Sequence, residues 1–216
     1  MADAAPHPDD WSTISNELLH GLVHALNNRM AALGALVELA RLGDEPGDTL
    51  EGLSDELTML GQVNALFALL PERRSEPEAL ELSAALDDAL RLHAHHPRLR
   101  HVGCEALVDD ALSPVRAPRW ALVRALVLLV HAAKRAGESL QDRGVATIQL
   151  RADGPEVVVR VEAPGTPAAE LLALAERCGA RAEREGDALT LRLPTLAELR
   201  RRERELRGES DVVPVR

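Results

Sequence analysis

The sequence predicts an α+β protein in two parts: a long antiparallel helical hairpin, followed by an α/β sandwich. Two observations lead to this fold class. Hydrophobic residues make up 46% of the chain and are mostly Leu, Ala and Val, while aromatic residues are only 1%, a composition that favours helices. After residue 78, the apolar pattern changes from one long helical period to short segments that alternate between helix-like and strand-like. A chain of 216 residues can form two small domains.

The hairpin is predicted for residues 12–71. The first helix should run from Ser12 to Leu42, a stretch without proline, and the second should end at Leu70-Pro71 after a turn at Gly43 to Asp48. The apolar residues of the two helices recur every three or four positions: Leu19, Leu22, Leu26, Leu33, Leu36 and Ala40, then Leu50, Leu53, Leu57, Leu60 and Phe67. One hairpin cannot cover stripes this wide, so we expect two copies to pair as a four-helix bundle.

The second domain is predicted for residues 78–194, after a charged, proline-bracketed linker at Pro71 to Pro77. We expect helices at 82–93, 118–137 and 168–178, and strands near 102–108, 146–151, 156–162, 181–185 and 188–193. Residues 195–216 should form a charged helix, at about 198–207, and a frayed tail. Residues 1–11 are expected to be disordered.

Charge and hydropathy narrow the function classes. The net charge is −10 and no Lys/Arg tract is interleaved with aromatic residues, so a nucleic acid is not an expected partner. The longest wholly apolar run, Ala125 to Val130, is too short to cross a bilayer, and the first residues lack the pattern of a signal peptide. We therefore expect no membrane segment and a cytoplasmic location. Cys104 and Cys178 lack a metal or redox spacing and should be reduced thiols.

A histidine in the first predicted helix lies on the face away from the apolar stripe. At about 100° per residue, His24 is opposite the stripe centred on Leu22 and Leu26, so its imidazole should be exposed. A neutral imidazole nitrogen is a nucleophile towards phosphorus near neutral pH. Six residues share or flank this face and are expected to form a docking surface for a protein partner: Glu17, His20, Asn28, Ala31, Ala35 and Glu38.

The string from His24 to Arg29, His-Ala-Leu-Asn-Asn-Arg, resembles the phospho-accepting box of bacterial sensor histidine kinases. That box usually reads His, acidic, Leu, polar, Asn, Pro. Ala25 replaces the acidic residue, which in the family helps phosphorylation by ATP, and Arg29 replaces the proline. The order of the later elements resembles the ATP-binding domain that follows the hairpin in this family. The resemblance implies a dimerisation and phosphotransfer hairpin joined to an ATPase-like α/β sandwich.

The second domain departs from the family at its nucleotide site. His131 stands where the family has the asparagine of its Mg²⁺–phosphate site. The segment from Val161 to Thr166 lacks the family's Asp-x-Gly-x-Gly, and Glu162 could replace the aspartate only after a shift in register. The next helix follows at once, without room for a nucleotide lid or a glycine-rich phosphate cradle. The sandwich is therefore expected to be degenerate and to bind no ATP or other cofactor.

These features favour a dimeric histidine phosphotransferase that relays a phosphoryl group between response-regulator receivers through His24. The resemblance is closest to kinase-like histidine phosphotransferases, and any Mg²⁺ would belong to the partner receiver. Two alternatives stay open: a non-catalytic pseudokinase scaffold that modulates two-component signalling, and an active kinase with unusual motifs. His20 is a rival phosphate acceptor one turn before His24.

Two further expectations concern polar residues away from His24. The run His93-Ala94-His95-His96, with His101 beyond it, looks like a metal cluster, but without a carboxylate or cysteine in ligand spacing we expect a solvated loop. Folding the hairpin about its turn should also bring Arg29 near Gln62 and Asn64.

Overall fold

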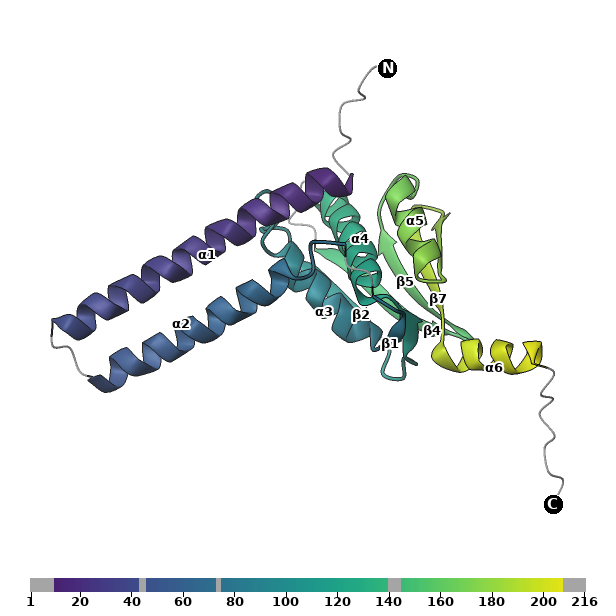
Figure 1. The fold of residues 1–216 in the computed structure, drawn as a ribbon. Helices are drawn as coiled ribbons and strands as arrows, with labels where there is room; N and C mark the ends of the chain where they lie inside the picture. The colour runs from purple at the N-terminus through teal and green to yellow at the C-terminus, as the bar shows by residue number, and fades with distance from the viewer. Residues whose placement is uncertain (1–9, 43–45, 73–74, 140–144, 208–216) are drawn as a thin grey trace, which may run out of the picture.

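The computed structural model describes residues 10–42, 46–72, 75–139 and 145–207. Two long antiparallel helices, α1 (Trp11–Arg41) and α2 (Pro46–Phe67), project as a hairpin from a domain built on a β-sheet (Figure 1). Helix α2 begins at Pro46, so the prediction of a turn up to Asp48 is wrong by three residues. Proline is well suited to the first turn of a helix, because its missing N–H would have no intrahelical partner there.

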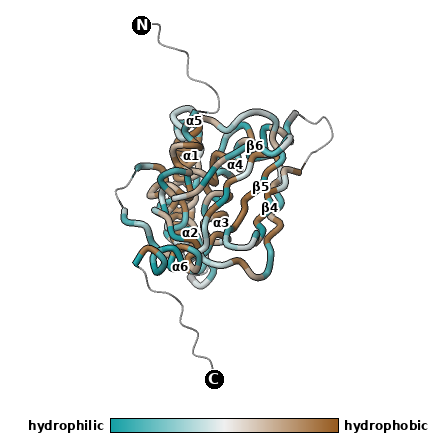
Figure 2. Tube along the Cα trace, turned by 90° about the vertical axis from the view of Figure 1, so that its right-hand side faces the viewer, coloured by the Kyte–Doolittle hydropathy of each residue, from teal (hydrophilic) through white to brown (hydrophobic). Residues whose placement is uncertain are grey.

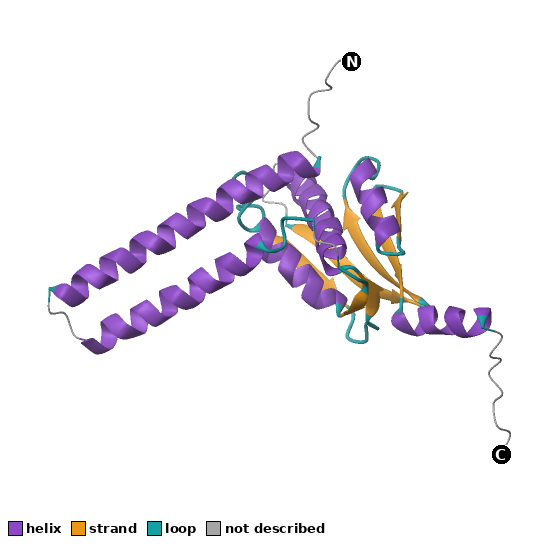
Figure 3. Cartoon of the chain, in the orientation of Figure 1, coloured by secondary structure: helices purple, strands orange, loops and turns teal. Residues whose placement is uncertain are grey.

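The sheet of the second domain has five strands in the order β2 (Cys104–Val108), β4 (Ala146–Asp153), β5 (Glu156–Glu162), β7 (Ala188–Pro194) and β6 (Arg181–Glu185). The pair β2 and β4 is parallel, and the other pairs are antiparallel. Three helices complete the sandwich, and α6 (Leu196–Leu206) extends from its end (Figure 3). They are α3 (Leu82–His93), α4 (Arg119–Ser139) and α5 (Ala169–Arg177).

The core of the domain lies between α4 and the sheet. Alternate residues of β4, such as Ile148 and Leu150, point towards α4 and are fully buried. Arg192 of β7 forms ion pairs with Asp153, Glu183 and Glu185, so it belongs to a charged network rather than to the core. Both hydrophobic and hydrophilic stretches occur along the chain of this domain (Figure 2).

The two edges of the sheet differ in chemistry. Strand β6 carries the sequence Arg-Ala-Glu-Arg-Glu, and its charges are typical of a protected edge. Strand β2, at the opposite edge, exposes Leu107 and Val108. Only β4 pairs with β2 in the described part of the chain.

The predicted fold class, a helical hairpin followed by an α/β sandwich, is confirmed. The bounds of α3, β5 and β6 agree with the sequence prediction. Two short strands were missed, β1 (Glu78–Leu80) and β3 (Val115–Ala117), which pair antiparallel in a small separate sheet. Three-residue strands are too short to give a clear alternating pattern. Residues 102 and 103, predicted as strand, precede β2, and the predicted tail lies outside the described residues.

The first part of α1 anchors the hairpin to the second domain. Its buried residues, Trp11, Ile14, Leu18 and Leu22, belong to the same core cluster as α3 and α4. The guanidinium of Arg124 on α4 lies 4.4 Å from the ring centroid of Trp11 and 5.2 Å from that of Trp120. Arg124 also donates to the Leu70 carbonyl at 3.0 Å. This arginine therefore joins both ends of the hairpin to α4.

Glycine permits the closest approach between the hairpin and the second domain. A Cβ atom on Gly21 of α1 would lie 1.7 Å from the carbonyl oxygen of His95. Any side chain at this position would push α1 away from the segment that follows α3. The glycine thus sets where α1 crosses the domain, one turn before His24.

Candidate functional site

His24 lies in the middle of α1 with its side chain exposed. The Asn28 amide nitrogen, one turn further along, is 3.3 Å from His24 Nε2. When this amide donates, Nε2 is the acceptor and the ring proton stays on Nδ1. The nitrogen that carries the lone pair is then the one that faces Asn28. The hydrogen bond orients the exposed ring, and Nε2 is available as a nucleophile when this bond opens.

Most residues of the expected docking surface are exposed beside His24. The exposed members are His20, Asn28, Ala31, Ala35 and Glu38. Glu38 pairs with Arg41 at 2.7 Å, and Ala31 and Ala35 are the members of the surface with small side chains. A flat patch of small side chains lets another protein approach the imidazole closely.

Glu17 is placed differently from the rest of this surface. Its carboxylate contacts Arg98 and lies 2.6 Å from His96 Nε2, and both residues follow α3 in the second domain. Glu17 is consequently half-buried. The second domain thus covers the N-terminal end of the expected docking surface.

Arg29, which replaces the proline of the family pattern, finds a partner that we did not predict. Its guanidinium pairs with the Glu56 carboxylate on α2 at 3.0 Å, so the prediction of Gln62 and Asn64 as neighbours is wrong. The carboxylate is largely buried, and a charged partner offsets the desolvation of both groups. The ion pair ties the two helices together at the level just beyond His24.

Three histidines form a buried cluster between α1 and the second domain. His93, His96 and His131 are 0%, 1% and 4% exposed, so the prediction of a solvated loop is wrong for the first two. Their ring centroids are 5.1 to 5.5 Å apart, and His93 Nε2 is 3.3 Å from His131 Nδ1. Burial, followed by the nearby His131, Lys134 and His96, lowers the pKa of His93 to about 2. His93 is therefore neutral at physiological pH.

This cluster is not arranged as a metal centre. Within the described ranges, no group of three or more His, Cys, Asp or Glu side chains is placed to hold a metal ion. The nearby Lys134, whose pKa is lowered chiefly by burial, also disfavours a cation. His131, which stands where the family has the asparagine of its Mg²⁺–phosphate site, is buried.

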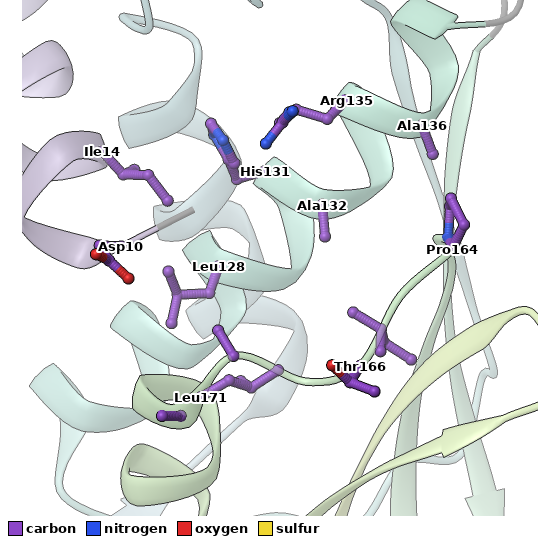
Figure 4. A pocket seen from close by; sticks show the side chains of 13 residues that line it. Asp10, Ile14, Leu128, His131, Ala132, Arg135, Ala136, Pro164, Thr166 and Leu171 are labelled. Carbon is purple, nitrogen blue, oxygen red and sulfur yellow. The ribbon is translucent and has the colours of Figure 1, made fainter. Parts of the chain in front are cut away.

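A cavity of about 400 Å³ lies beside His131, between α1, α4 and the segment that joins β5 to α5 (Figure 4). Its wall is a mixture of apolar and polar groups, and the polar side chains are Asp10, His131, Arg135 and Thr166. Glu162 pairs with Arg160 at 2.8 Å and does not line the cavity. It therefore does not take the place of the family's aspartate at this cavity. The cavity can hold a small molecule, but its lining lacks an aspartate from the strand end.

Sequence reasoning missed the contact between Glu17 and His96, in the turn after α3. The available signal was the spacing His93-x-x-His96 at the end of an amphipathic helix. Residues three apart lie on the same side of a helix, so this spacing places the two histidines next to each other. By itself the spacing resembles a metal motif. It instead marks the surface where the helix of His24 meets the second domain.

No protein-family model matches the chain, and no curated protein sequence is similar to it. In the part of the chain that the structure describes, no helix is both long enough and apolar enough to span a membrane.

The solved structures similar to this chain include members of the family that the sequence resembles. One is the Acinetobacter baumannii histidine kinase AdeS, at 15% identity and a TM-score of 0.44, covering 80% of this chain and 98% of that one. A bacterial phosphotransferase has 15% identity and a TM-score of 0.40 over 83% and 95%. The histidine kinase ThkA, in complex with the response regulator protein TrrA, has 16% identity and a TM-score of 0.42 over 86% and 63%.

Proposed function

We propose that this protein is a dimeric histidine phosphotransferase in which His24 carries a phosphoryl group between response-regulator receivers. The observation that carries the proposal is the exposed His24 imidazole, held by Asn28 at 3.3 Å beside a flat patch of small residues. A lone surface histidine would need neither the oriented ring nor the flat surroundings. The Leu-Asn-Asn sequence after His24 gives independent support.

The transfer step needs only an imidazole and an aspartyl phosphate on the partner. The Asn28 hydrogen bond opens and frees the lone pair of His24 Nε2. The lone pair then attacks phosphorus, and the acyl–phosphate bond breaks as the electron pair returns to the partner's carboxylate. The proton on Nδ1 stays in place, so the product is a phosphoimidazolium. The Asn28 amide that faced the lone pair can then donate to a phosphoryl oxygen. Transfer to a second receiver is the reverse of this step.

We propose that the second domain takes part without nucleotide. His131 lines the cavity at the position where the family has an asparagine, and Glu162 is engaged outside it. Only residues 163–168 separate β5 from α5, too short a connection for a glycine-rich lid. Any Mg²⁺ required for transfer belongs to the receiver in this proposal.

We propose that two copies pair through the hairpin as a four-helix bundle. Several large apolar side chains of α1 and α2 are exposed in the single chain, with Met30 56% and Leu57 58% exposed. A contiguous apolar surface of this kind is typical of a protein interface. Receivers would then dock on the other face, at His20, Asn28, Ala31, Ala35 and Glu38, and at Glu17 when Arg98 and His96 release it.

The test is transfer from a panel of receivers phosphorylated with radioactive acetyl phosphate. We expect acid-labile, alkali-stable label on the protein, and its loss in His24→Ala. His20→Ala is the matched control, because His20 is also exposed on α1, and it should keep the label. Mg-ATP supplied in place of a phosphorylated receiver should give no label.

Other results would change the assignment. Receiver binding without any label on His24 would favour the scaffold, since that role needs only the docking surface. If the label is lost in His20→Ala but kept in His24→Ala, the phosphate acceptor is His20 and not His24. Label from Mg-ATP alone would make the protein a kinase.

A further inference from the structure

Glu17 on the His24 helix contacts His96 of the second domain, and His96 belongs to a group of three buried histidines there. We call this group the histidine junction and define it as Glu17, His93, His96 and His131. Glu17 comes from α1, His93 and His96 from the end of α3 and the turn after it, and His131 from α4. The junction is therefore a point where three separate parts of the chain meet.

Each contact of the junction depends on which ring nitrogens carry protons. The backbone N–H of Leu99 donates to His96 Nδ1 at 3.2 Å, so a neutral His96 has its proton on Nε2, where Glu17 lies 2.6 Å away. His93 Nε2 and His131 Nδ1 are 3.3 Å apart, and only one proton fits between them. A second proton there would set two N–H groups against each other and loosen the end of α3 from α4, next to the His95 carbonyl on which α1 packs.

We propose that the histidine junction is an acid-sensitive latch: protonation of its imidazoles releases α1 from the second domain in mildly acidic solution. The release itself is a property of the fold. Its consequence, that Glu17 and the neighbouring face of His24 become available to a partner, rests on the proposed function.

The charged groups around the junction make added positive charge unfavourable. Arg98 and Lys134 face it, as do His93, His96 and His131 themselves, while Glu17 and Glu138 are the carboxylates that act on it. Burial is the largest effect and lowers the pKa of His93 to about 2, and it also lowers the pKa of His95 and His96. For His96 the Glu17 carboxylate raises the pKa, but burial outweighs it.

The direction of the pH dependence follows from these shifts. Released histidines have the ordinary pKa of about 6.5, above the values they have in the latch, so the released state binds more protons as the pH falls. The latch is fully closed above about pH 6.5 and is weakened below it. For His93 alone, the equilibrium constant for release should rise about tenfold between pH 7.5 and pH 5.5, and His95 and His96 act in the same direction.

The chain contains its own reporter of release. Trp11 on α1 packs on the guanidinium of Arg124, so release should expose its indole. In a Trp120→Phe variant of the full chain, Trp11 is the remaining tryptophan. Acrylamide quenching of its fluorescence should increase severalfold between pH 7.5 and pH 5.5. Far-ultraviolet circular dichroism at each pH should show that the helices persist.

Variants in this background assign the response to the junction. His93→Gln removes one titrating ring and should reduce the pH response about tenfold, while the exposed control His20→Gln should leave it unchanged. Should His93→Gln fail to fold, imidazole ¹⁵N resonances of the unmutated chain replace it: His93 should gain its proton at the pH where Trp11 is released.

Three results would overturn the proposal. Quenching of Trp11 that is constant down to pH 5 would show that no release occurs. A loss of helical signal at the same pH would mean unfolding of the domain instead of release. Release of Trp11 while His93 remains neutral would place the sensor elsewhere.

Discussion

In the sheet domain the leucines and valines of α4, β4 and β5 are almost all fully buried, whereas beyond Leu22 the hairpin leaves many large apolar side chains exposed. The difference shows that the two parts have different requirements for stability. The sandwich buries its apolar residues within one chain. The outer half of the hairpin is held by α1–α2 contacts and by the Arg29–Glu56 ion pair, and it still presents an apolar surface. This surface is where the proposed dimer contact would lie.

The largest expected effect comes from the core of the sandwich. Leu126 of α4 is fully buried, so Leu126→Ala removes packed methyl groups and leaves a cavity. Such substitutions cost about 2 to 5 kcal/mol of unfolding free energy. Urea denaturation followed by circular dichroism measures the change. A loss below about 1 kcal/mol would show that this core is not the main source of stability.

A charge in the exposed apolar stripe should act on assembly instead. Leu57→Asp would bury an unpaired carboxylate in the proposed four-helix bundle, and the dimer dissociation constant should rise at least about a hundredfold, or roughly 2.7 kcal/mol. The domain should stay folded, because Leu57 is exposed in the single chain. Sedimentation at micromolar concentrations measures the change. If the unmutated protein is already a folded monomer there, the dimer proposal fails.

The smallest expected effect is at the proposed acceptor. His24 is exposed and its contact with Asn28 is also at the surface, so His24→Ala should change the free energy of unfolding by less than about 0.5 kcal/mol. Thermal denaturation measures this. A loss above about 1 kcal/mol would reveal a structural role and would weaken any conclusion drawn from the transfer activity of that variant.

The sequence predicted the features that depend on local pattern. Residues Val157 to Val161 and Leu189 to Leu193 alternate or run apolar over enough positions to identify β5 and β7, and the three-four spacing identified both long helices. The exposure of His24 followed from its place opposite the stripe. These features depend only on neighbours in the chain.

The sequence could not predict contacts between distant elements. The pairing of Glu17 with His96 depends on how α1 crosses the second domain, and that angle is set by Gly21 against the His95 carbonyl. Arg29 meets Glu56 because of how far α1 and α2 are shifted along each other, and the sequence does not define that shift. Both contacts were missed because the periodicity of one helix does not define its position relative to another.

The unequal edges of the sheet have a consequence for handling the protein. A strand whose backbone groups are open on one side is a template for addition of another strand, and charged residues discourage this. The Arg and Glu residues of β6 protect one edge, whereas β2 presents Leu107 and Val108 at the other. At high concentration, another chain would therefore add a strand to the free side of β2, opposite β4, and aggregation would begin at this edge. A lysine in place of Leu107 is the simplest way to improve shelf life without touching the hairpin.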